Sequence, residues 1–489
     1  MVHLFLLLIL GLTCGPRATA QFDIVLAGGR VMDPESGLDA VRYVGLRGDR
    51  VAAISDRPLE GKTVVDVKGL VVAPGFIDLH AHGQSNQANQ YQARDGVATA
   101  LELESGVPFV ETWISRRAGQ ALLNYGATVS HGAARARVMK EMAEEIAKRK
   151  DAAGTELTAS PISYLARYKS LNHPEELSQL AAELEKGLRE GGLGIGLPHQ
   201  YYPGATRDEI FRVFQMAARW KVPIFTHVRS MGLEAMQEVL ANAAATGASL
   251  HIVHVNSSSL GSLPVILELI DSARSRGLDV TTEAYPYTAG STSLQSAIFD
   301  EGWQQRLGIS YQDIQWQDTG ERLTAETFEK YRKSGGVVII HMMKPEWIDL
   351  AMETPFVMIA SDGMPYAPGA HPRSAGTFSR VLGRYVRERK VLTLMEALRR
   401  MTLLPAERLA SIAPQMKNKG RLRAGADADI TVFDPDQATD TATFEGGLSF
   451  SKGIRHVLVN GVFVVRDGET VPGVLPGRPV TGRYGRVGE

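Results

Sequence analysis

Cysteine is nearly absent from this chain, which has a single one, Cys14, among 489 residues. Cys14 lies in the N-terminal segment MVHLFLLLILGLTCGPRATA, whose apolar run is too short to span a bilayer. The small residues Ala18-Thr-Ala20 before Gln21 are typical of a signal-peptide cleavage site. Once residues 1–20 are removed the mature chain has no thiol, which excludes disulfides, cysteine nucleophiles and thiolate metal ligands.

We therefore predict that residues 1–20 are a signal peptide and that the protein is secreted or periplasmic, with no membrane span in the mature chain. Two alternatives stay open at the N-terminus. One is lipid attachment at Cys14, although the preceding Gly11-Leu12-Thr13 matches that signal only loosely. The other is a buried N-terminal segment.

An excess of charge of either sign is also missing. The chain has 53 Lys+Arg and 54 Asp+Glu, a formal net charge of -1, so nothing indicates a nucleic-acid partner. The apolar fraction of 44% and the charged fraction of 22% fit an ordinary globular enzyme with a small-molecule substrate. The length exceeds what one core holds, so we expect a large catalytic domain and a smaller module. The oligomeric state stays open.

Two stretches that are far apart in the chain share one residue pattern. Residues 22–72 alternate short β-branched runs with Gly, Asp and Pro turns, and the same pattern returns from Gly420 and from Ile454. We predict that they pair into one small antiparallel β-sandwich domain. Its parts are residues 21–72 and 413–489.

Between these stretches, residues 73–412 alternate apolar strand-like runs with longer helical patterns, which predicts an α/β fold, a (β/α)8 TIM-like barrel. The runs number about eight, as such a barrel requires. An excursion with an extra run, VVIIHMM, separates the last two, and we predict a lid at about residues 295–336; a structural excursion on the rim is the alternative. The runs are GFIDLHAH, ATALELE, GATVSHG, GLGIGLPH, VPIFTHV, SLHIVHVN, DVTTEAYPY and FVMIASDG.

Histidines end several of these runs. His80 and His82 stand two apart on a strand and so point the same way, toward the barrel mouth. His227 and His254 end two later apolar runs, where an unpaired imidazole would be costly, so we predict that all four are metal ligands. His251 starts its strand and is expected to be structural.

Acidic residues complete the predicted site. Asp362 closes the eighth run and is our candidate general base. Imidazoles with an aspartate suit Zn²⁺, as one or two ions, better than calcium or magnesium. A second ion needs an anionic bridge; GLGIGLPHQ offers no lysine, whereas Glu102 and Glu104 face one side of the second run. Glu104, nearer the mouth, is the favoured bridging metal ligand and Glu102 the reserve; a salt bridge to an internal arginine and a mononuclear site are the alternatives.

The strings PGFIDLHAH, THVRSMG, EAYPYTAGST, ASDG and HPRSAGTF stand in the order of a known family. From about Phe22 to its C-terminus the chain resembles the amidohydrolase superfamily, and within it the N-acyl-D-amino-acid deacylases. The resemblance implies that Tyr285, Ser291 and Arg373 hold a substrate carboxylate and that Asp362 shuttles the proton. Without the resemblance, the alternative interpretation is that Tyr285 is a core aromatic residue and that Arg373 is a solvated charge on a loop.

Two departures from the family pattern concern ligands. At the register where the family has a metal-binding cysteine this chain has Ser105, a much poorer ligand than a thiolate. The family's His-His-Lys at the end of the sixth strand is replaced by His254-Val255-Asn256, which removes a cation that would meet a carboxylate. The preferred acyl amino acid therefore stays open.

The expected reaction is hydrolysis of the amide bond of an N-acyl amino acid by metal-activated water, without a covalent intermediate. The resemblance implies the D configuration for that amino acid. Asp362 takes the proton and returns it to the leaving amine. Tyr285 and His371 are candidate donors at the rim of the oxyanion pocket, and His371 is also a candidate substrate-binding residue. A dipeptidase and a cyclic amidase are the rival enzymes, the latter disfavoured by the missing lysine. A noncatalytic binding barrel is the rival from another class.

Overall fold

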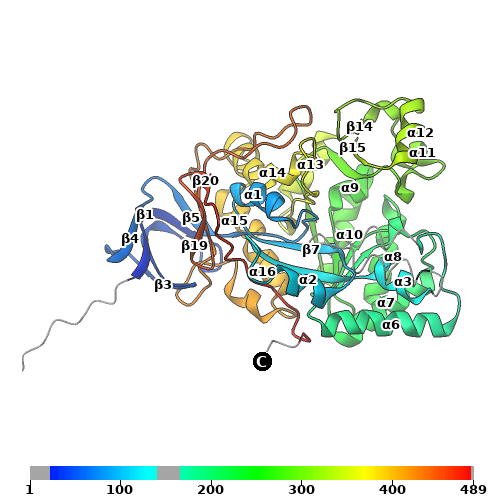
Figure 1. Cartoon of the computed structure of the whole chain (residues 1–489), viewed down its shortest axis with the longest axis horizontal. Helices are drawn as coiled ribbons and strands as arrows, with labels where there is room; N and C mark the ends of the chain where they lie inside the picture. The colour runs from blue at the N-terminus through cyan, green and yellow to red at the C-terminus, as the bar shows by residue number, and fades with distance from the viewer. Residues whose placement is uncertain (1–21, 140–141, 143–165, 486–489) are drawn as a thin grey trace, which may run out of the picture.

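The computed structural model describes residues 22–139, 142 and 166–485 (Figure 1). The predicted signal peptide and Cys14 lie outside these described residues. Within the described part of the chain, no helix combines the length and the apolar character that crossing a membrane demands.

Eight strands form one parallel sheet whose order follows the chain, and each overlaps one of the eight predicted runs; β7 and β8 extend beyond theirs. Hydrogen bonds from Ser361 N to Asp78 Oδ1 (3.0 Å) and from His82 N to Gly363 O (2.7 Å) join the last strand region to the first. The sheet is thus a nearly closed barrel, as predicted. The strands are β6 (Phe76–Asp78), β7 (Val97–Val107), β8 (Asn124–Ser130), β9 (Ile195–Pro198), β10 (Ile224–His227), β11 (Leu250–Ile252), β12 (Val280–Ala284) and β16 (Val357–Ile359).

Amphipathic helices surround the barrel, and α7 (Arg207–Trp220) shows why they form. Its buried residues Ile210, Val213, Phe214 and Ala217 recur at helical spacing, and the Thr206 side chain caps the helix by accepting from Glu209 N. Among the described residues of the barrel, the other helices are α1 (Asn86–Arg94), α2 (Val110–Arg117), α3 (His131–Val138), α6 (Pro174–Arg189), α8 (Leu233–Thr246), α9 (Val255–Ser259), α10 (Leu263–Ser275), α13 (Pro345–Glu353), α14 (Arg373–Arg380), α15 (Leu394–Met401) and α16 (Leu403–Leu409).

The predicted excursion is a folded unit with its own antiparallel sheet, which we call the inserted sheet. Its strands, in the order β13 (Ala289–Ser293), β15 (Val337–His341) and β14 (Ile314–Trp316), pack with α11 (Trp303–Leu307) and α12 (Ala325–Ser334) around an aromatic core. The unit is wider than the predicted residues 295–336, because β13 begins earlier and the run VVIIHMM supplies β15. Figure 1 shows it far from the strands at the chain ends.

The two chain ends form one nine-stranded sheet, in blue and red in Figure 1. The prediction of an antiparallel sandwich is wrong in one respect: β4 and β5 pair with β1 in parallel, so the sheet is mixed. The two ends meet where β5 pairs with β17. The strands are β1 (Phe22–Asp33), β2 (Leu38–Arg47), β3 (Arg50–Ser55), β4 (Gly61–Asp66), β5 (Val71–Pro74), β17 (Ile430–Phe433), β18 (Ile454–Val459), β19 (Val462–Arg466) and β20 (Glu469–Thr470).

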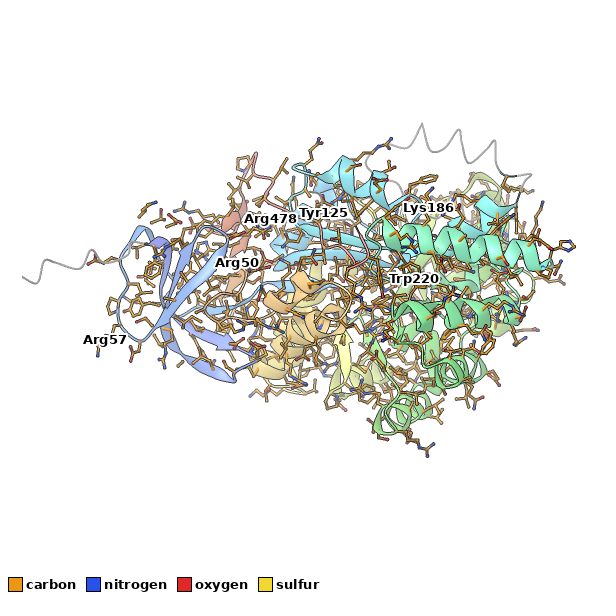
Figure 2. The ribbon with its side chains drawn as sticks, turned by 90° about the horizontal axis from the view of Figure 1, so that it is seen from below. Arg50, Arg57, Tyr125, Lys186, Trp220 and Arg478 are labelled. Carbon is orange, nitrogen blue, oxygen red and sulfur yellow. The ribbon has the colours of Figure 1, made fainter. Side chains whose placement is uncertain are left out.

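Buried polar contacts fasten the nine-stranded sheet to the barrel. The Asp429 carboxylate lies 2.6 Å from Lys419 Nζ, and it accepts from Asn124 Nδ2 of β8 at 2.9 Å. The C-terminal tail also crosses to the barrel, where Tyr125 N donates to Arg478 O and Val480 N donates to Tyr125 O; Figure 2 labels Tyr125 and Arg478 beside each other. These contacts hold the first and last parts of the chain on the barrel wall.

Replacing Lys419 by Met tests this junction. The change leaves Asp429 buried without its cation, and breaking a buried pair in this way costs about 3–5 kcal/mol. We expect denaturant unfolding to show a loss of that order. The matched control is Lys62→Met, whose ion pair with Asp23 is exposed, with side-chain exposures of 65% and 42%, and which should change stability by about 1 kcal/mol or less. Equal losses of stability in the two variants would contradict a stabilising role for the buried Lys419–Asp429 pair.

Candidate metal centre

The predicted ligands converge at the C-terminal mouth of the barrel. Their ligand atoms form two groups, and within each group the atoms lie within 4.8 Å of one another. His80, His82 and Asp362 make one group, and Glu104, His227 and His254 make the other. We call these six residues the metal cluster. The convergence follows from parallel strands, since their carboxyl ends all meet at one edge of the barrel.

The Glu104 carboxylate lies between the two imidazole pairs. Its Oε2 is 3.4 Å from His80 Nε2 and 3.2 Å from His82 Nε2. Its Oε1 is 3.0 Å from His227 Nδ1 and 3.2 Å from His254 Nε2. One carboxylate oxygen thus faces each pair, which is the arrangement of a bridging ligand between two cations.

The outer nitrogens of the imidazoles have fixed partners. His80 Nδ1 donates to Glu283 Oε1 at 2.6 Å, and His82 Nδ1 donates to Glu102 Oε2 at 2.8 Å. Because a carboxylate only accepts, each Nδ1 carries the proton and each Nε2 turns a lone pair inward. Glu102, the reserve candidate for the bridge, therefore orients His82 instead of bridging.

Glu283 is a functional residue that the sequence reasoning missed. Besides His80 it binds His251, whose Nε2 lies 3.0 Å from its Oε2, so His251 is structural as predicted. An acidic residue inside the buried run DVTTEAYPY was the available signal. Gln200 was missed too; its Oε1 accepts from His227 Nε2 and leaves Nδ1 to face Glu104.

The inner face of the metal cluster consists of acceptors and demands cations. The His80 Nε2 and His82 Nε2 atoms are only 3.2 Å apart, and Asp362 Oδ1 is 3.4 Å from each. Burial acts to lower the pKa of both imidazoles, but Asp362 beside His80 and Glu102 beside His82 outweigh it and hold each pKa well above its usual value. Divalent ions satisfy the same demand, and this nitrogen and oxygen donor set suits the borderline metals.

The backbone is strained at two of these residues. His254 has φ 32° and Asp362 has φ 51°, both in the left-handed region that residues with a side chain seldom adopt. Asp78 stabilises the second of these turns by accepting from Ser361 N at 3.0 Å. Such strain costs on the order of 1–3 kcal/mol per residue and persists where the surrounding structure enforces it, often at functional sites.

A cavity of about 420 Å³ opens over the metal cluster, and Tyr285, Ser291 and Arg373 line it. Arg373 is 1% exposed; its Nη2 lies 2.9 Å from Asp362 Oδ2, and its guanidinium carbon lies 4.5 Å from the centre of the Tyr285 ring. The ion pair is poorly directed, and neither the guanidinium nitrogens nor the hydroxyls of Tyr285 and Ser291 make a well-directed hydrogen bond to a described residue. These three residues form a donor cluster suited to a ligand rich in oxygen.

His371 does not contact this cavity, contrary to its predicted place in the oxyanion pocket and the substrate site. It is fully buried; Nε2 donates to Ala289 O at 2.9 Å, and Nδ1 accepts from Arg373 N at 3.0 Å. Both ring nitrogens are thus occupied by backbone groups.

Comparisons with known proteins agree with this fold. Residues 63–465 match the model of the amidohydrolase family. A D-aminoacylase from Alcaligenes xylosoxydans xylosoxydans is 30% identical over 495 residues, covering 91% of this chain and 95% of the relative. The chain belongs to the amidohydrolase family.

Two solved structures carry metal information. N-acyl-D-glutamate deacylase from Bordetella bronchiseptica, in complex with zinc and a phosphonate that mimics the tetrahedral intermediate, superposes with a TM-score of 0.76 at 26% identity over 95% of this chain and 99% of its own. A D-aminoacylase with a binuclear metal centre, for which one-metal activation and second-metal attenuation are described, superposes with a TM-score of 0.78 at 25% identity over 94% and 100%.

In this amidohydrolase, Glu104 is a candidate metal ligand and Ser105 is not. Ser105 Oγ lies 3.4 Å from Glu104 Oε2 and belongs to neither group of the metal cluster. Ser105 also lines the cavity, but only the Glu104 carboxylate has an oxygen near each imidazole pair.

Glu104→Gln should lower the bound divalent metal by at least half, because the amide removes the negative charge shared by both imidazole pairs. The measurement is metal content by mass spectrometry after dialysis against metal-free buffer. Ser105→Ala is the matched control on the next residue and should keep the parental content. An unchanged content in Glu104→Gln, or a loss in Ser105→Ala, would refute the bridging assignment.

Proposed function

We propose that this protein is a zinc-dependent deacylase that hydrolyses N-acyl-D-amino acids to a carboxylate and a free amino acid. The observation that best supports this activity is the position of the Glu104 carboxylate between two buried imidazole pairs. The donor cluster beside it is suited to bind a carboxylate. The names of the relatives, D-aminoacylase and N-acyl-D-glutamate deacylase, support this substrate class and its D configuration.

The metal cluster fits zinc through its nitrogen and oxygen donors, with Glu104 shared between two positions. Zinc held there supplies Lewis acidity toward the amide carbonyl and a lowered pKa for the attacking water. We propose two zinc positions, each of which is occupied according to its own affinity for the ion.

The donor cluster binds the substrate carboxylate in this proposal. Arg373 offers a planar fork of N–H donors, and Ser291 adds a hydroxyl. Burial raises the pKa of Tyr285 to about 12, so its hydroxyl remains a donor at neutral pH. Anchoring this end of the substrate sets the amide over the metal cluster.

Asp362 serves as the general base and then the general acid. Burial acts to raise the pKa of Asp362, but Arg373 and His80 outweigh it and hold the pKa below its usual range, so the group is ionised at neutral pH. Oδ1 accepts the proton of the attacking water and delivers it to the leaving nitrogen, while Arg373 holds Oδ2.

The test is a panel of N-acetyl and N-formyl derivatives of D- and L-amino acids, dipeptides and a hydantoin, given to zinc-loaded protein. We expect turnover of N-acyl-D-amino acids and a fall in kcat of about 10²–10⁴-fold in Asp362→Asn, relative to bound zinc. Asp208→Asn, an exposed aspartate on α7, is the control. Parental turnover by Asp362→Asn would refute its role, and hydrolysis of dipeptides alone would make the protein a dipeptidase.

We also propose that the protein is exported, on the strength of the apolar N-terminal segment and its small-residue cleavage site. Expression of the full chain with its native N-terminus should give mature protein outside the cytoplasm, starting at Gln21 when its N-terminus is determined by mass spectrometry. Intact protein that retains residues 1–20 in the cytoplasm would contradict export.

A further inference from the structure

The donor cluster is assembled from two separate parts of the fold. Arg373 opens α14 on the barrel, whereas Ser291 lies on β13 of the inserted sheet. Two anchors on separate elements grip one small carboxylate only if the distance between the elements is fixed to a fraction of an ångström. Some other contact must therefore set that distance.

His371 joins the two parts through its ring. Nε2 donates to the carbonyl of Ala289, two residues before Ser291, and Nδ1 accepts the backbone N–H of Arg373. A carbonyl only accepts and an amide N–H only donates, so a single neutral tautomer, with the proton on Nε2, satisfies both bonds. The imidazole is a spacer of fixed length between β13 and the start of α14.

An aromatic residue from the C-terminal part of the chain holds this spacer in place. The Phe444 ring packs edge to face on His371, with centroids 5.1 Å apart, and on His341 of β15, with centroids 4.8 Å apart. The Phe444 carbonyl accepts from Gln315 Nε2 of β14 at 2.7 Å. Phe444 thus contacts two strands of the inserted sheet and the spacer together.

We propose that His371 is a positioning residue for carboxylate recognition, which fixes Ser291 and Arg373 at the spacing that one carboxylate requires, with Phe444 holding its ring. This inference rests on the proposed function, because the anchored group is the substrate carboxylate. Loss of His371 frees the inserted sheet relative to α14 and leaves the metal cluster intact.

The discriminating readout is the preference for N-acetyl-D-leucine over N-acetyl-D-leucinamide, which carries a neutral amide in place of the carboxylate. A residue that only stabilises the fold affects both substrates alike. His371→Ala should lower the ratio of the two kcat/KM values about tenfold, mainly through KM for the acid, with parental zinc content. Tyr285→Phe, which removes a donor of the cluster itself, sets the scale.

Two isosteric variants separate the two bonds. In His371→Asn the side-chain oxygen can still accept from Arg373 N, as in an Asx-turn, and in His371→Gln the side-chain amide can still donate to Ala289 O. Each should fall between the parent and His371→Ala. Phe444→Ala should lower the ratio in the same direction, and Phe444→Leu should retain more of it.

The matched control is His456→Ala on β18, another buried histidine, whose Nδ1 accepts a backbone N–H from Asp467 but lies in the nine-stranded sheet. It should leave the ratio unchanged even if the melting temperature falls. An unchanged ratio in His371→Ala, or equal losses on both substrates, overturns the positioning role. A parent that turns over no N-acyl amino acid refutes the proposed function itself, whereas a parent that fails to prefer the acid refutes the donor cluster.

Discussion

Four buried carboxylates at the barrel mouth determine how the surrounding side chains are arranged. Glu102, Glu104, Glu283 and Asp362 are all nearly buried, and Arg373 is the only arginine or lysine among the described residues that line the cavity. Buried carboxylates are tolerated only with cations and hydrogen bonds close by. The outer nitrogens of His80, His82 and His227 are accordingly held by acceptors, so that their lone pairs face inward, where divalent ions would balance the charge.

Strand geometry divides the work between two glutamates on β7. Residues two apart share a face, so Glu102 and Glu104 both point into the barrel. Glu102 orients His82, whereas Glu104, two residues further along the strand, faces both imidazole pairs. With metal bound, Glu104 would supply the anion that neither the serine at position 105 nor the lysine-free end of β9 provides.

Local sequence patterns predicted the barrel strands and the side chains at their ends. They did not predict the features that depend on contacts between residues far apart in the chain. The eight strands and the ligands at their ends follow from apolar runs that end in histidine or acid. The role of His371 does not follow, because its ring binds Ala289, far away in the chain. The mixed pairing of β4 and β5 with β1, and the early start of the inserted sheet, likewise depend on contacts between residues that are distant in sequence.

The structure carries several unfavourable features around one cavity: left-handed backbone at His254 and Asp362, and buried donors without well-directed partners at Tyr285, Ser291 and Arg373. Each lowers the stability of the free protein, and the rest of the fold must compensate. A substrate carboxylate, as proposed, would satisfy all three donors at once. In the proposed function this carboxylate would link β13 and α14, the two elements that His371 already joins through its ring.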